Sequence, residues 1–258
     1  MCLTLFAYQA VPGYPLILVS NRDEFQHRPT HVASFWDHAP HVLAGRDATG
    51  GGTWLGVTKD GRIANVTNHR DFRIPAVEAG PSRGALTADF LLPEQRDKKA
   101  PAYLEKIHPE AERYNGFNLL VGTLEDLWFY SNREREVKRI EPGFHGLSNA
   151  LLDTPWPKLE DGRKAMQAAL QANPRAEEEI LRIMRKTEMY PDEQLPDTGR
   201  DLEFERLVSP IFIENPVYGT RATTILRIRE DGVGEYIERT FNAEAIPQID
   251  ARFEFRIS

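Results

Sequence analysis

The only cysteine of the sequence, Cys2, directly follows Met1. Its small side chain permits removal of the initiator methionine, which leaves one residue that carries both a thiol and a free α-amine. The α-amine has a reference pKa of about 8 and the thiol one of about 8.5, so the amine can accept the thiol proton directly or through one water. This position indicates nucleophilic catalysis. The alternative is a small buried hydrophobe at the start of the first strand.

The tetrapeptide Asn21-Arg-Asp-Glu24 stands at the end of an apolar run. If this run and the first strand form a hairpin, Arg22 and Asp23 come close to Cys2. An arginine beside a thiol lowers the pKa of the thiol, and a carboxylate can orient the terminal ammonium or the attacking sulfur. The alternative is a solvated arginine and aspartate in a turn, which contribute little to stability.

Composition and charge exclude several classes of function. The net charge of −7 and the pI near 5.6 argue against a nucleic acid partner, because phosphate binding needs a clustered basic excess. The apolar runs are far shorter than the roughly 20 residues of a membrane span. No basic segment opens the N-terminus, as it does in a secretory signal. A single cysteine cannot form an internal disulfide, so we expect a reducing compartment and a cytoplasmic protein.

The histidines and glycines do not predict a metal or phosphate site. A proline, Pro29 or Pro40, interrupts each of the two close histidine pairs, so neither pair can share a helical face. The glycine run at residues 50 to 52 lacks the spacing of a phosphate-binding loop and predicts a turn in which the backbone passes close to the site. We therefore expect that the chemistry requires no cofactor.

The elements that must position these residues come in runs, with strands first, then helices, then strands again. Strands are predicted for residues 3–9, 15–21, 42–45, 53–58, 62–68, 116–122, 127–131, 136–140, 220–229 and 234–241, and helices for residues 82–92, 101–107, 156–171 and 175–187. A polar, proline-containing stretch over residues 190 to 200 predicts a surface excursion. This order indicates one α+β domain over residues 1 to 258, either two facing sheets with helices outside or a generic α+β arrangement.

The pair formed by Cys2 and the Asn-Arg-Asp-Glu tetrapeptide resembles the NRDE family, which includes the transport and Golgi organization 2 proteins. Further stretches that look like family blocks follow in order along the chain: Gly45-Arg-Asp-Ala-Thr-Gly-Gly-Gly-Thr-Trp-Leu-Gly56, Asn65-Val-Thr-Asn-His-Arg70, Ser82-Arg-Gly84, Gly146-Leu-Ser-Asn-Ala-Leu-Leu-Asp-Thr-Pro-Trp-Pro-Lys158 and Thr220-Arg-Ala-Thr-Thr-Ile225. They extend over nearly the whole chain.

The family in turn is similar to the N-terminal nucleophile hydrolases of the penicillin V acylase and bile salt hydrolase group. This resemblance implies a four-layer αββα sandwich with the nucleophile at the start of an inner strand. It also implies that Cys2 is nucleophile and base, with Arg22 and Asp23 beside it. The acylases separate their arginine and aspartate by two residues, whereas the two are adjacent here.

Three more residues take expected roles from the same resemblance. Asn68 matches the position of an oxyanion-hole asparagine, where a side-chain amide stabilises a tetrahedral intermediate by roughly 3 to 4 kcal/mol in comparable sites. Asn149 corresponds to a second asparagine of the site, and Arg221 to an arginine near the nucleophile. The alternative for each of the three is a residue of a turn or a cap.

Two hypotheses of different classes follow. The first is a cysteine amidohydrolase that cleaves a non-peptide C–N bond of a small-molecule amide through an acyl-enzyme on Cys2. The second is a non-catalytic carrier of a hydrophobic ligand on a hydrolase scaffold. It is suggested by the eukaryotic relatives, which are linked to Golgi organisation, lipid homeostasis and haem trafficking. In this second case the thiol or a loop histidine ligates haem iron.

Overall fold

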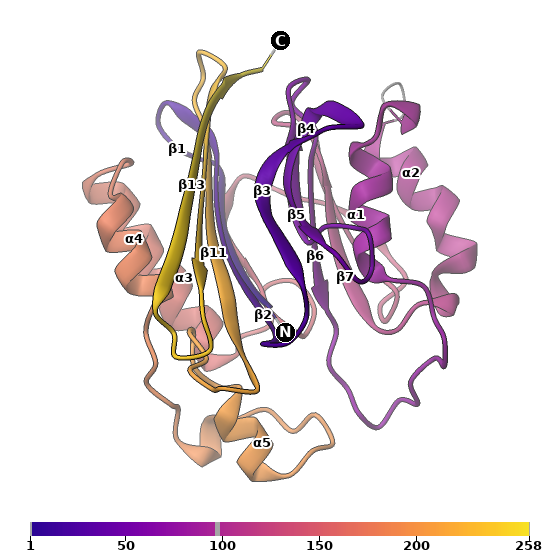
Figure 1. Cartoon of the computed structure of the whole chain (residues 1–258), viewed down its shortest axis with the longest axis vertical. Coiled ribbons are helices and arrows are strands. Elements are labelled where there is room, and N and C mark those ends of the chain that lie inside the picture. Colours follow the sequence, from indigo (N-terminus) through magenta and orange to yellow (C-terminus); the bar gives the residue numbers. More distant parts are fainter. Residues whose placement is uncertain (1, 96–98, 258) are drawn as a thin grey trace.

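The computed structural model describes residues 2–95 and 99–257. Two antiparallel sheets face each other, and helices cover the outer face of each sheet (Figure 1). The α+β arrangement of two facing sheets, which the sequence left open against a generic alternative, is therefore confirmed.

Of the described strands, six form one sheet in the order β10-β1-β2-β11-β12-β13. A tight turn joins β1 to β2, and its Gly13 takes a φ of +80°, which glycine adopts without steric cost. This turn fixes the register that sets Cys2 opposite Arg22. The bounds are β1 (Cys2–Val11), β2 (Tyr14–Phe25), β10 (Gly143–Leu147), β11 (Tyr218–Ile228), β12 (Val233–Phe241) and β13 (Pro247–Arg256).

Seven further strands of the described chain form the second sheet, in sequence order from β3 to β9. A tight turn joins β5 to β6, with Gly61 at a φ of +80°. The bounds are β3 (Thr30–Trp36), β4 (Ala39–Asp47), β5 (Leu55–Thr58), β6 (Ile63–Asn68), β7 (Phe117–Gly122), β8 (Leu127–Ser131) and β9 (Val137–Arg139).

The helices divide between the two outer faces. Helices α1 (Arg83–Leu91) and α2 (Ala100–Ile107) pack on the second sheet, and α3 (Pro157–Ala172) and α4 (Glu177–Met184) pack on the first. The short helix α5 (Leu202–Leu207) lies below the sheets in Figure 1, at the end where the N-terminus lies. Short 3-10 segments cover Pro93–Gln95, His108–Arg113 and Asp192–Gln194.

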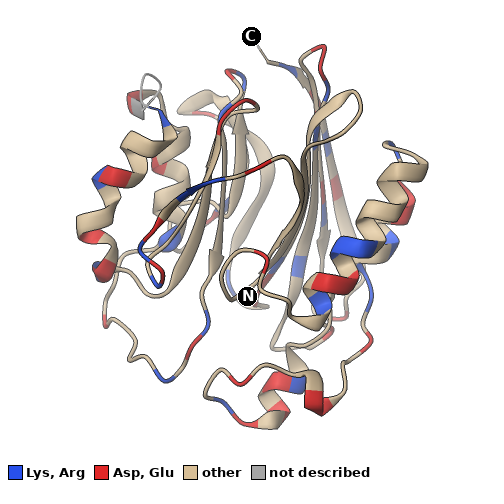
Figure 2. Cartoon of the chain, turned by 180° about the vertical axis from the view of Figure 1, so that it is seen from behind, with Lys and Arg blue, Asp and Glu red and all other residues tan. Residues whose placement is uncertain are grey.

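The core has three main clusters because each sheet packs against helices on its outer face and against the other sheet on its inner face. Alternate residues of a strand point to opposite faces. Leu3 and Leu5 therefore pack under α3 and α4, while Phe6 packs between the sheets. The third cluster holds Phe90 and lies under α1 and α2. Charged residues of both signs are interspersed along the outer helices and the loops (Figure 2).

The sequence prediction missed three strands, for different reasons. In β10, Gly-Phe-His-Gly-Leu, two glycines remove the apolar alternation. Most residues of β13 are exposed, so it carries only a weak alternation. For β3, no element was predicted between residues 21 and 42. The predicted excursion at residues 190 to 200 is mostly exposed and holds one 3-10 turn. No helix within residues 2–95 or 99–257 has the length and apolar character of a membrane span.

Candidate active site

Cys2 lines a cavity of about 300 Å³ and is 8% exposed. The cavity lies where the ends of the two sheets meet. The first sheet contributes Cys2 and the end of β2, and the second contributes Asn68 at the end of β6. The start of α1 closes a further side with Arg83. Four of the predicted residues, Cys2, Arg22, Asp23 and Asn68, thus line one cavity.

Burial raises the pKa of the Cys2 thiol above its ordinary value. The negative charge of Asp23 acts in the same direction. The backbone amide of Asp23 and the guanidinium of Arg22 act in the opposite direction. The thiol therefore needs a nearby base to form the thiolate at neutral pH.

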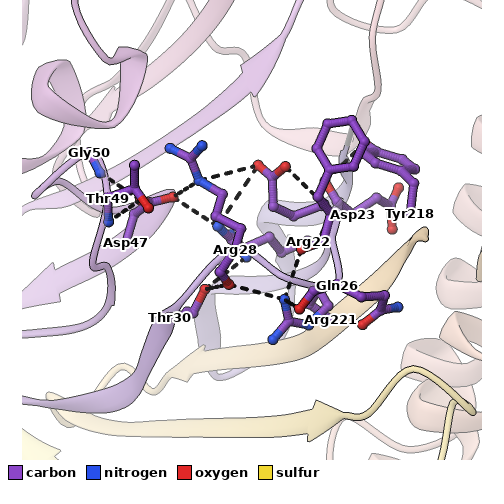
Figure 3. A network of polar contacts seen from close by, with 12 residues as sticks. Arg22, Asp23, Gln26, Arg28, Thr30, Asp47, Thr49, Gly50, Tyr218 and Arg221 are labelled. Atoms are coloured by element: carbon purple, nitrogen blue, oxygen red, sulfur yellow. Dashed lines mark hydrogen bonds and ion pairs between the residues drawn. The ribbon is translucent and has the colours of Figure 1, made fainter. Parts of the chain in front are cut away.

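Arg22 is buried and held from several sides (Figure 3). Its Nη2 forms an ion pair with Asp47 Oδ2 at 3.0 Å, and its Nη1 donates to Thr30 Oγ1 at 3.3 Å. The guanidinium also lies over the Trp54 ring, with 4.4 Å between its carbon and the ring centroid. A planar cation held this way has one fixed orientation, so Arg22 is a pre-positioned charge beside Cys2.

Asp47 joins Arg22 to a second arginine. Arg28 Nε donates to Asp47 Oδ2 at 2.7 Å, and the backbone amides of Thr49 and Gly50 donate to Oδ1 at 3.0 and 2.7 Å. Although burial opposes it, these donors hold the pKa of Asp47 below its usual range. Asp47 therefore stays ionised at neutral pH and anchors Arg22.

The sequence predicted that the backbone of the glycine run passes close to the site, and in the structure this run comes close to the start of α1. Gly51 has a φ of +73°. A Cβ at Gly52 would lie 2.2 Å from the carbonyl carbon of Gly84, so no side chain fits there. The contact of these two backbones sets the distance between the start of α1 and Trp54, and both line the cavity.

Asp23 is buried beside the cavity and accepts a hydrogen bond from Thr220 Oγ1 at 2.7 Å. Burial raises the pKa of its carboxyl, and the positive charge of Lys158 and the Thr220 bond oppose that rise. Lys158 is itself buried, and its Nζ donates to the Val208 carbonyl at 2.9 Å. Burial lowers the pKa of Lys158 to about 8, while the charges of Asp23 and Cys2 act to raise it.

The charge of Lys158 acts on Asp23 and Cys2, although Lys158 was not predicted from the sequence. A signal was present, because Lys158, Gly162 and Met166 recur every four residues along the buried stripe of α3. A lysine in an apolar stripe needs a reason, and its nearness to Asp23 and Cys2 supplies one.

Asn68 and Asn149 are joined, but only Asn68 lines the cavity. The side-chain amide of the buried Asn149 donates to the backbone carbonyl of Asn68 at 2.8 Å. Asn149 thus touches the cavity wall through the main chain of Asn68. This contact makes it a residue that positions the oxyanion-hole candidate.

Arg221 lies away from the Cys2 cavity. Its Nη1 donates to the carbonyls of Phe25, Gln26 and Arg28 at 3.0, 2.9 and 3.2 Å (Figure 3). The register between β11 and β2 shifts at this residue. Arg221 also lines a second cavity, of about 260 Å³, together with Arg22 and Glu238. Its observed contacts hold the turn that follows β2.

Arg83 is the second site residue that was not selected from the sequence, although it lies in the Ser82-Arg-Gly84 block. Its Nη1 donates to the Gly116 carbonyl at 3.1 Å. Burial lowers the pKa of Arg83, and the charge of Cys2 acts in the opposite direction. Arg83 also borders a groove of about 610 Å³ that adjoins the Cys2 cavity and shares Asn68, Arg83 and Asn115 with it.

Within the described ranges, no group of three or more histidine, cysteine or acidic side chains is arranged to hold a metal ion.

Comparisons with known proteins identify relatives of this chain. The family model for Transport and Golgi organisation 2 matches residues 1–243. The chain is 36% identical over 261 residues to the Transport and Golgi organization protein 2 homolog of Bos taurus, with 93% of each chain covered. It is 33% identical over 279 residues to the Homo sapiens homolog, with 100% of this chain and 99% of that protein covered.

A solved structure extends the likeness to the fold. The C2A mutant of the conjugated bile acid hydrolase from Clostridium perfringens aligns with a TM-score of 0.52 and 8% identity, over 99% of this chain and 92% of that one. That hydrolase has the N-terminal nucleophile hydrolase fold, and at this identity the likeness is one of fold alone. By its sequence, the chain belongs to the Transport and Golgi organisation 2 family.

Proposed function

We propose that the protein is an N-terminal cysteine hydrolase that cleaves the amide C–N bond of a small molecule through an acyl-enzyme on Cys2. The observation that carries this proposal is the placement of Cys2, Arg22, Asp23 and Asn68 around one cavity at the start of an inner strand. The layered architecture of helices, two sheets and helices supports it. So does the likeness to a hydrolase that was crystallised with its own second-position cysteine replaced.

The first half of the reaction forms the acyl-enzyme. Once Met1 is removed, the α-amine of Cys2 takes the thiol proton, and the sulfur attacks the amide carbonyl carbon. A C–S bond forms, and the carbonyl oxygen becomes negatively charged. The side-chain amide of Asn68 donates to this oxygen. The C–N bond then breaks, and the leaving amine takes the proton from the α-ammonium.

The second half releases the acyl group. Water loses a proton to the α-amine and attacks the thioester carbon. The C–S bond breaks, the carboxylic acid leaves, and the sulfur recovers a proton from the ammonium. Asp23 is the carboxylate that orients the ammonium, and Lys158 favours its ionised form. Arg22, fixed by Asp47, stabilises the thiolate that each half of the reaction passes through.

The test is hydrolysis of candidate amides by the wild type and by Cys2→Ala and Cys2→Ser. Loss of a covalent nucleophile lowers kcat by more than about a thousandfold. We expect that loss in Cys2→Ala, with the fold retained by circular dichroism. Equal turnover by Cys2→Ala and the wild type contradicts the proposal.

One observation favours the carrier hypothesis as a second candidate. The groove beside the Cys2 cavity has room for a ligand, and His69 lines it. His69 Nδ1 is buried and accepts or donates no hydrogen bond within the described residues. Burial and the charge of Arg133 lower the pKa of His69, so the neutral imidazole that ligates iron prevails at neutral pH. His69 is thus the residue that would hold haem.

A haem titration separates this candidate from the first. A Soret shift at stoichiometric protein, lost in His69→Ala, supports the haem carrier. Absence of the shift in the wild type removes the haem version.

A further inference from the structure

The groove beside the Cys2 cavity is built from three parts of the chain. One wall is the segment that follows β6, with Phe72 and Ile74. A second wall is α5, with Phe204 and Leu207, and the ends of β2 and β11 close the third side. Because the groove shares residues with the Cys2 cavity, one ligand can occupy both.

The groove collects apolar side chains that are otherwise costly to expose. Phe72 is 50% exposed and Phe25 46%, and Ile74 and Leu207 are exposed as well. Phe72 meets Phe204 edge to face at a centroid distance of 5.4 Å. Clustered exposed apolar surface marks a site that a ligand or partner covers. This wall therefore fits an apolar body.

The polar side of the groove carries three arginines, Arg83, Arg133 and Arg200, none of which forms an ion pair within the described part of the chain. Arg83 donates only to a carbonyl, and Arg133 Nε is buried without a hydrogen-bond partner. Arg200 lies over Phe72 and Phe204, at 5.1 Å from each ring. None of the three therefore has a carboxylate at ion-pair distance within the described residues, although the charge of Glu24 acts on Arg83 from further away.

The other charged residues in and beside the groove form ion pairs, unlike these three arginines. Arg70 pairs with Glu205 at 2.8 Å, and both are buried. Asp71, the acid of the groove wall, pairs with Arg73 at 2.8 Å. The groove therefore has excess positive charge beside an apolar wall. Guanidinium groups bind carboxylate, sulfonate and phosphate oxygens in a bidentate manner.

We propose that the groove binds a soluble anion with an apolar body, and that the substrate of the Cys2 site is an amide of this kind. This second part rests on the proposed hydrolase function. The apolar body lies along Phe72 and Phe204. The negative group pairs with Arg133 and with Arg83, which borders both cavities, so the anion lies within a few bonds of the amide at Cys2.

Binding is tested on Cys2→Ala protein, in which turnover does not interfere. Three probes separate the contribution of the negative charge from that of the apolar chain. N-dodecanoylglycine carries both, N-dodecanoylethanolamine has the same chain without charge, and N-acetylglycine has the charge without the chain. Calorimetry is expected to show N-dodecanoylglycine binding at least about tenfold more tightly than either of the others, since a charged hydrogen-bonded pair contributes that much. Equal affinity for the charged and neutral long-chain probes overturns the proposal.

Variants locate the site. Arg133→Gln and Arg83→Gln are expected to weaken N-dodecanoylglycine binding about tenfold and to leave binding of the neutral probe unchanged. Arg133→Lys, which keeps the charge, restores part of the affinity. Phe72→Ser weakens both long-chain probes. The control is Arg182→Gln, an exposed arginine on α4. Wild-type affinity in Arg133→Gln and Arg83→Gln overturns the proposal.

Turnover of the same probes by the wild-type protein separates this inference from the proposed function. Selective binding without hydrolysis supports the groove and counts against the hydrolase. Hydrolysis with no preference for charge or chain supports the hydrolase and overturns the groove proposal.

Discussion

Cys2 and Arg22 stand directly opposite each other in the antiparallel pair of β1 and β2. Side chains at opposite positions of such a pair lie on the same face of the sheet. The thiol and the guanidinium therefore share one cavity, and Asp47 and Trp54 hold the guanidinium in place. A short hairpin thus brings a fixed cation to a thiol twenty residues earlier in the chain.

Replacement of Arg22 is expected to make the thiol less reactive. Its positive charge lowers the pKa of Cys2, so Arg22→Gln raises that pKa. We expect alkylation by iodoacetamide at pH 7 to slow by roughly three- to tenfold, with the pH profile of labelling displaced to higher pH. Labelling at the wild-type rate would show that Arg22 has no electrostatic role, and Arg182→Gln serves as the control.

The two asparagines are expected to differ in what they affect. Asn68→Ala removes the proposed oxyanion donor, so kcat is expected to fall by about 10² to 10³ with little change in KM. Asn149→Ala removes a buried hydrogen bond to the Asn68 carbonyl, which lowers the free energy of unfolding by roughly 1 to 3 kcal/mol. Urea unfolding and steady-state kinetics on both variants measure this. A larger loss of kcat in Asn149→Ala than in Asn68→Ala would reverse the assigned roles.

Lys158 is expected to set the acid limb of the pH profile. Its charge lowers the pKa of Asp23, so Lys158→Met raises that pKa. Because the proposed mechanism needs the Asp23 carboxylate, the acid limb of kcat/KM is expected to move to higher pH. Lys164→Met, an exposed lysine on the same helix, is the matched control. An acid limb that does not move would place Lys158 in a packing role alone.

Because of Glu238, the folded protein is expected to lose stability as the pH rises from acidic to neutral. Burial raises its pKa to about 7, and it accepts bonds from the Ala33 amide and Thr224. The unfolded chain releases this proton near pH 4.5 and the folded protein near pH 7, so unfolding becomes easier as pH rises between these values. Glu238→Gln avoids the loss.

The effect of Glu238→Gln is measured by urea unfolding at pH 5 and pH 8. The variant is expected to gain on the order of 3 kcal/mol relative to the wild type over this interval. The same pH dependence in both proteins would mean that Glu238 titrates normally.

Local sequence patterns predicted the parts of the site that local structure makes. The β1–β2 hairpin follows from two apolar runs and a Pro-Gly turn, and it alone places Arg22 and Asp23 near Cys2. Lys158 interacts electrostatically with Asp23 and donates a hydrogen bond to Val208, and both partners are far from it in sequence, so no local pattern reveals these interactions. The register shift at Arg221 is also invisible in sequence.

The intact mass of the purified protein, before and after a short reaction with iodoacetamide at neutral pH, tests the role of Cys2 most directly. We expect a mass that lacks Met1 and the rapid addition of one carbamidomethyl group, absent in Cys2→Ala. A mass that retains Met1, or a Cys2 that resists labelling, would mean that the amine is blocked or the thiol is inaccessible, and would contradict an N-terminal nucleophile.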